Sequence, residues 1–156
     1  MTSILLNILW PTFALVALVM IVWFTLFAQR LAHMKRTPPA PGTMASPSAA
    51  LAYFEPVAMP ANNLANLFEM PVLFFALVPL LVIGGMASVL QVALAWLFVF
   101  ARAVHSLIHI SRKPVPARFM AYLASNIVLF AMWIGFFVDM VVSASAYSQL
   151  VKGAVH

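Results

Sequence analysis

Two groups of polar side chains recur at helical spacing within long apolar stretches of this sequence. Asn62, Asn66 and Glu69 follow the i, i+4, i+7 rule, so a helix presents all three on one face. A second group is spaced by three and four residues and also falls on one helical face: Arg102, His105, His109 and Arg112. Such side chains bind polar ligands, but they are costly in lipid. Both groups are therefore expected to face a bundle interior or a subunit interface.

Glu69 and Arg102 are expected to form a buried ion pair. They lie about 10 Å and about 12 Å from the same end of two adjacent apolar runs, at 1.5 Å per residue. Loss of one partner from such a pair costs about 3–5 kcal/mol. A metal site made of His105, His109 and Glu69 is the alternative, but the two histidines lack a companion glutamate in their own helix and Arg102 repels cations. We expect no metal.

The composition places these side chains in a membrane protein. Of the 156 residues, 65% are hydrophobic and 7% are charged, against about 25% charged in soluble domains. This excludes disorder and a nucleic-acid partner despite the net charge of +5, and the absence of cysteine excludes disulfides and a cysteine nucleophile. The apolar runs predict an all-α integral membrane protein with one domain over residues 1–156, built as an antiparallel bundle of four spans: 4–28, 62–83, 86–110 and 116–147.

The basic residues predict how the spans are oriented. Residues 30–60 form the one long connection, and its prolines and serines indicate a cap-like or partly extended surface loop rather than another span. Six of the eight basic residues lie in this loop or follow the end of the third span: Arg30, Lys35, Arg36, Arg112, Lys113 and Arg118. The positive-inside rule therefore places both connections in the cytoplasm and both termini outside. Arg118 lies within the first turn of the fourth span, beside the bundle interior.

Pro71 marks a local irregularity in the second span. It has no N–H to donate, so the carbonyl of Leu67 is left free next to Asn66 and Glu69. This predicts a kink and a polar pocket at that level. Since both polar groups lie in the same half of the bilayer, we expect a hydrophilic chamber that opens to the cytoplasm.

The order and spacing of these motifs resemble a known family over nearly the whole chain. The motif residues are Asn66-x-x-Glu69-x-Pro71 opening the second span, Arg102-x-x-His105-x-x-x-His109 closing the third, and Arg118 beginning the fourth. In this order they resemble the superfamily of membrane-associated proteins in eicosanoid and glutathione metabolism. The likeness is to a bacterial-type member similar to microsomal glutathione transferases.

The resemblance implies a left-handed four-helix bundle that assembles as a homotrimer. It implies that glutathione binds on the cytoplasmic half, in clefts between adjacent subunits. Asn66 and Glu69 would hydrogen-bond the backbone and amino group of the tripeptide, and Arg102 would engage its carboxylates or hold Glu69. Arg118 matches the arginine that lies near the sulfur in leukotriene-forming members. Arg30 matches another carboxylate-binding arginine.

This chain departs from the family pattern in two respects. Glutathione-binding members carry an arginine four residues before the motif asparagine, where this chain has Asn62, and they often carry tyrosines where it has Met70, His105 and His109. The loss of a charge-assisted contact is worth about 1.5–3 kcal/mol. The histidines can hydrogen-bond in place of the phenols, so Asn62, His105 and His109 are kept among the expected glutathione ligands.

The resemblance implies a glutathione-dependent membrane enzyme. The expected reaction is conjugation of glutathione to a lipophilic electrophile or reduction of a lipid hydroperoxide, with the second substrate arriving from the membrane lipids. Arg118 is the expected catalytic residue, because a fixed cation stabilises a thiolate. The alternative is a non-catalytic scaffold of the same fold that binds a lipid or another ligand, which the asparagine at position 62 favours.

Overall fold

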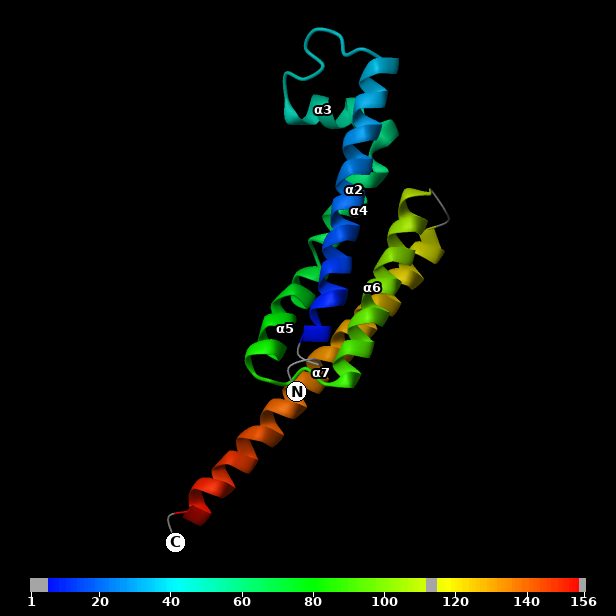
Figure 1. Cartoon of the computed structure of the whole chain (residues 1–156). Coiled ribbons are helices and arrows are strands. Elements are labelled where there is room, and N and C mark those ends of the chain that lie inside the picture. Colours follow the sequence, from blue (N-terminus) through cyan, green and yellow to red (C-terminus); the bar gives the residue numbers. More distant parts are fainter. Residues whose placement is uncertain (1–5, 112–114, 155–156) are drawn as a thin grey trace.

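The computed structural model describes residues 6–111 and 115–154, and within these residues it is helical with no strand. Four segments are long and apolar enough to cross a membrane, which makes the chain an all-α, multi-pass integral membrane protein (Figure 1). The second of these segments is built from two helices. The elements in order are α2 (Leu9–Arg36), α3 (Pro47–Phe54), the 3-10 helix η1 (Glu55–Val57), α4 (Met59–Leu67), α5 (Pro71–Ile83), α6 (Val89–Ile110) and α7 (Val115–Ala154).

The first and last spans are longer than the sequence predicted. α2 continues eight residues beyond position 28, because no proline or glycine follows Pro11 until Pro38, and it ends at Arg36, with Thr37 as its C-cap just before that proline. α7 runs to Ala154, whereas its expected end was residue 147. Figure 1 shows the C-terminal part of α7 extending past the α5–α6 connection, away from the other helices.

The connection after α2 folds into a cap that contains α3 and η1, and α2 itself continues into the stretch 30–60 as far as Arg36. Ser46 caps α3, where its side chain accepts a hydrogen bond from the backbone N–H of Ala49 at 3.2 Å. Tyr53 donates its hydroxyl hydrogen to the carbonyl of Thr37. These contacts fold α3 back onto the end of α2.

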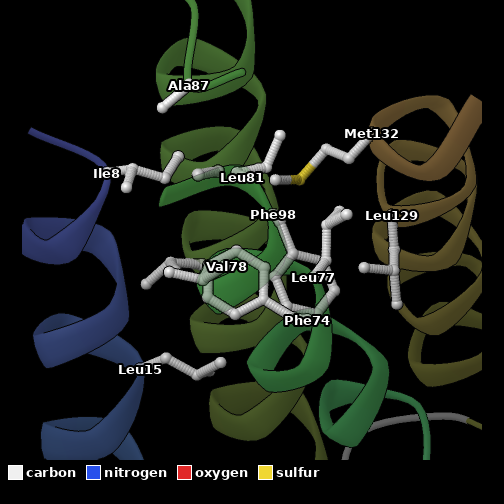
Figure 2. Packing of buried hydrophobic residues seen from close by; sticks show 12 residues of the cluster. Ile8, Leu15, Phe74, Leu77, Val78, Leu81, Ala87, Phe98, Leu129 and Met132 are labelled. Carbon is white, nitrogen blue, oxygen red and sulfur yellow. The ribbon is translucent and has the colours of Figure 1, made fainter. Parts of the chain in front are cut away.

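An apolar core fills the half of the bundle that contains the α5–α6 connection (Figure 2). Phe74 of α5 and Phe98 of α6 stack with ring centroids 5.0 Å apart. Around them lie buried aliphatic side chains from the first, second and fourth spans: Ile8, Leu15, Leu77, Leu81, Leu129 and Met132. This half of the interior is apolar apart from Gln91, and the buried arginine and histidines of α6 lie in the other half.

Gln91 fixes the approach of α6 to α7. Its buried side-chain amide donates to the carbonyl of Met132 at 3.0 Å. Gly135 lies one turn further along α7, and a Cβ on it would sit 3.0 Å from the same amide nitrogen. A glycine is therefore needed there for the two helices to come this close.

Candidate functional site

The polar stripe of α6 lies on one face and is buried. Arg102, His105 and His109 are 0%, 2% and 4% exposed. The rings of His105 and His109 have centroids 5.5 Å apart, as the four-residue spacing requires. Arg112, the expected fourth member, lies outside the described residues. Apolar residues on the opposite face of α6, such as Phe100 and Leu107, are exposed and turn toward lipid.

Arg102 is held by a backbone carbonyl rather than by a carboxylate. Its Nη2 donates to the carbonyl oxygen of Asn66 at 2.7 Å. Its Nε and Nη1 are buried and have no hydrogen-bond partner among the described residues. The expected Glu69–Arg102 ion pair is therefore wrong for the single chain, in which Glu69 is exposed.

The reason for this error is a break in the second span. α4 ends at Leu67 and α5 begins at Pro71, with Phe68 in a non-helical conformation (φ −107°, ψ 6°). Helical spacing places Glu69 on the face of Asn62 and Asn66 only if the helix is continuous. The kink expected from Pro71 is present, and Glu69 lies within the break, where it is exposed and forms no ion pair with Arg102.

A cavity of about 310 Å³ lies between α4, α6 and the first turns of α7. Its lining combines amides, imidazoles, a guanidinium and two aromatic rings: Asn62, Asn66, His105, His109, Arg118, Phe119 and Tyr122. The Nδ1 atom of His105 lies 3.2 Å from the backbone carbonyl of Arg118, which ties α6 to the first turn of α7. The structure thus brings together five of the eight expected site residues in one cavity.

The other three expected residues, Arg30, Glu69 and Arg102, do not line this cavity. Arg102 lies next to it, since it bonds to Asn66 and its guanidinium carbon is 5.7 Å from the ring centroid of Tyr122. Arg30 packs over the ring of Phe54, with 4.7 Å from its guanidinium carbon to the ring centroid. In the single chain Arg30 therefore braces the cap formed by α3 and η1.

Two residues of this region were missed by sequence reasoning. Tyr122 lines the cavity one helical turn after Arg118, and that spacing was the signal that could have found it. Asn63 was passed over because it lies off the stripe of Asn62 and Asn66. It is fully buried, and neither atom of its amide has a partner among the described residues.

The described residues hold no group of three or more His, Cys, Asp or Glu side chains that could bind a metal ion. Glu69 accordingly does not join His105 and His109, as the metal alternative required. The unpartnered atoms instead include several hydrogen-bond donors, namely Nε and Nη1 of Arg102, the amide of Asn63 and the hydroxyl of Ser106, beside one ring nitrogen each of His105 and His109. Such a site suits an anionic, polar ligand.

Of the comparisons with known proteins, one finds a match. No curated protein and no solved structure matches the chain. The model of the MAPEG family matches residues 8–138, which include every helix that contributes to the cavity. The chain therefore belongs to the MAPEG family, the membrane-associated proteins in eicosanoid and glutathione metabolism.

Proposed function

We propose that this protein is a glutathione-dependent membrane enzyme that conjugates glutathione to lipophilic electrophiles or reduces lipid hydroperoxides. The observation that supports it most directly is the position of Arg118, whose side chain lines a cavity otherwise made of hydrogen-bonding and aromatic groups. Membership of the MAPEG family supports a glutathione-related or eicosanoid-related role at the coarser level.

Arg118 would stabilise the glutathione thiolate. A free thiol has a pKa of about 8.5 and is mostly protonated at neutral pH, whereas the thiolate is the nucleophile. A guanidinium keeps its charge and donates hydrogen bonds in a fixed fork. No carboxylate lines the cavity among the described residues, so nothing there competes with a thiolate for Arg118.

The remaining residues would bind the peptide part of glutathione. Asn62, Asn66, His105 and His109 line the same cavity and offer amide and imidazole groups. Arg102 has two donor atoms without partners within the described residues, which suits a carboxylate of the tripeptide. We further propose a homotrimer with the cavity on the cytoplasmic side, in which Arg30 and Glu69 face a cleft shared with a neighbouring subunit.

A non-catalytic scaffold is the second candidate. Asn62 lines the cavity at the position where glutathione-binding members carry an arginine. A neutral amide holds a carboxylate less strongly than a guanidinium does. The same fold could then bind a lipid or another amphipathic anion without turning it over.

A two-part measurement on the purified protein separates these candidates. Thermal unfolding is followed with glutathione, with S-hexylglutathione and with a tripeptide in which alanine replaces the cysteine, since a ligand that binds the folded state raises the melting temperature. The ultraviolet thiolate band is then recorded with glutathione. The proposal predicts stabilisation by all three ligands and a thiolate band that Arg118→Ala abolishes without loss of the stabilisation.

Failure takes two distinct forms. If none of the three ligands stabilises the protein, glutathione is not its ligand and the scaffold remains. If glutathione binds but the thiolate band is equally strong in Arg118→Ala, the protein binds glutathione without the role assigned to this arginine.

A further inference from the structure

The ring of Tyr122 packs beside two buried side chains of α6 at the cavity, while its hydroxyl group has no hydrogen-bond partner among the described residues. The ring centroid lies 5.8 Å from that of His105 and 5.7 Å from the guanidinium carbon of Arg102. Arg118 is exactly one turn earlier on α7 and lines the same cavity. The hydroxyl makes no hydrogen bond with any other residue that the structure describes, so it is free to donate to a bound molecule.

The other cavity groups are poorly suited to deliver a proton. The carbonyl of Arg118 can only accept a hydrogen bond, so the Nδ1 of His105 carries the hydrogen, and the Nε2 of the neutral ring is then an acceptor. A guanidinium does not give up its proton in a protein, and the amides of Asn62 and Asn66 are not acids. Tyr122 and His109 are the remaining candidates among the described lining residues.

Of the two, Tyr122 is the one that lies on the same helix as Arg118. It shares a helical face with Arg118, one turn away. When the glutathione sulfur contacts Arg118, the electrophile that reacts with this sulfur is therefore next to the phenol. The phenol is also a much stronger acid than an alkyl alcohol, which makes proton transfer to a departing alkoxide favourable.

We propose that Tyr122 protonates the oxygen atom that leaves when the glutathione thiolate attacks, and that the site therefore favours electrophiles with an oxygen leaving group, in particular lipid hydroperoxides. This inference rests on the proposed function, and it assigns both a second catalytic residue and a preferred class of substrate.

The reaction balances with glutathione as the only reductant. The thiolate sulfur attacks the terminal oxygen of the hydroperoxide; an S–O bond forms and the O–O bond breaks. The electron pair leaves on the alkoxide oxygen, which takes the proton of Tyr122 and departs as an alcohol. The glutathione sulfenic acid then reacts with a second glutathione thiol to give glutathione disulfide and water, and the phenolate regains the proton released when the first thiol ionised.

The experiment compares two substrates in the same variant. Tyr122→Phe removes only the hydroxyl and keeps the ring beside Arg102 and His105. Turnover of a fatty-acid hydroperoxide needs a proton on the leaving oxygen, whereas turnover of an aryl chloride releases chloride, which needs none. We expect the ratio of the two kcat values, hydroperoxide to aryl chloride, to fall at least about tenfold, since general acids contribute about 10²- to 10⁴-fold. Tyr147→Phe, on the exposed end of α7, is the matched control and should leave the ratio unchanged.

A measurement on the wild-type protein accompanies the variants. Hydroperoxide turnover should slow in heavy water more than aryl chloride turnover does, because only the former moves a proton to the leaving group. Equal loss of both activities in Tyr122→Phe, or a change of the ratio in His109→Gln instead, would overturn the assignment of Tyr122 while leaving the proposed function in place. A wild-type protein that turns over neither substrate would contradict the proposed function, and this inference with it.

Discussion

Arg102 carries a charge into the bundle interior and has one hydrogen bond there, to the carbonyl of Asn66. Its remaining buried donors have no partner among the described residues, an arrangement that costs stability unless a ligand or water satisfies them. The donors of Asn63 and Ser106 are in the same state. At the scale of single residues, these donors therefore favour a role in ligand binding over a role in holding the helices together.

The independence of Glu69 and Arg102 is testable with a double-mutant cycle. The free energy of unfolding is measured in detergent for Glu69→Gln, Arg102→Met and the double variant. Because Arg102 bonds to Asn66 and Glu69 is exposed, we expect the two changes to add, with a coupling free energy below about 0.5 kcal/mol. A coupling of several kcal/mol would show that the ion pair predicted by the sequence forms after all.

The break between α4 and α5 explains why the carbonyl of Asn66 is available to Arg102. In a continuous helix the carbonyl of Asn66 would accept from the N–H of residue 70, four positions later. Here α4 ends at Leu67, and the carbonyl accepts from Arg102 instead. Pro71 contributes by removing the N–H that would have continued the ladder to Leu67. At the scale of the element, a helix defect creates the polar contact.

Pro71→Ala tests this dependence. Alanine restores an N–H that can bond to the carbonyl of Leu67, which favours a continuous helix and draws the carbonyl of Asn66 back into the helical ladder. We expect the melting temperature of the free protein to stay the same or rise, while the stabilisation by glutathione shrinks. The measurement is a thermal unfolding titration, and an undiminished glutathione effect would contradict the link between the break and the site.

The α6–α7 contact offers a second test at this scale. Gly135→Val places a branched side chain against the amide of Gln91, which is anchored on the carbonyl of Met132. We expect a loss of about 1–3 kcal/mol in the free energy of unfolding, as for other overpacked interiors. Gln91→Ala should recover part of that loss in the double variant, since it removes the obstructing atoms. If the double variant recovers none of the loss, the destabilisation by Gly135→Val does not arise from contact with Gln91.

The sequence predicted those parts of the fold and of the site that follow from residue spacing within one helix. The stripe of Arg102, His105 and His109 was correct because α6 is an unbroken helix over those positions. Glu69 was misplaced because Pro71 predicts a kink but does not predict how the helical faces before and after the kink are rotated relative to each other. Tyr122 was missed because aromatic residues are common in membrane spans. Only its spacing of four residues from Arg118 marks it as a candidate site residue.

At the scale of the whole molecule, the two halves of the bundle differ. The half near the α5–α6 connection is packed with aliphatic and aromatic side chains, as Figure 2 shows, and the half near the α6–α7 connection holds the buried side chains of Arg102, His105 and His109. The half with the cavity is also the half whose connections carry Lys35 and Arg36 at the end of α2. The positive-inside rule thus predicts that the cavity opens toward the cytoplasm, where glutathione is available.

This orientation can be tested with single cysteines, because the chain has none of its own. Ser46→Cys lies in the connection after α2, where the side chain is partly exposed, and Ser148→Cys lies on the exposed C-terminal part of α7. In intact cells a membrane-impermeant maleimide should label Ser148→Cys and spare Ser46→Cys, and permeabilised cells should label both. The reverse pattern would place the cavity outside the cell, where the basic connections are unfavourable. It would also remove the proposed supply of glutathione, so labelling of Ser46→Cys in intact cells tells against both the orientation and the function that depends on it.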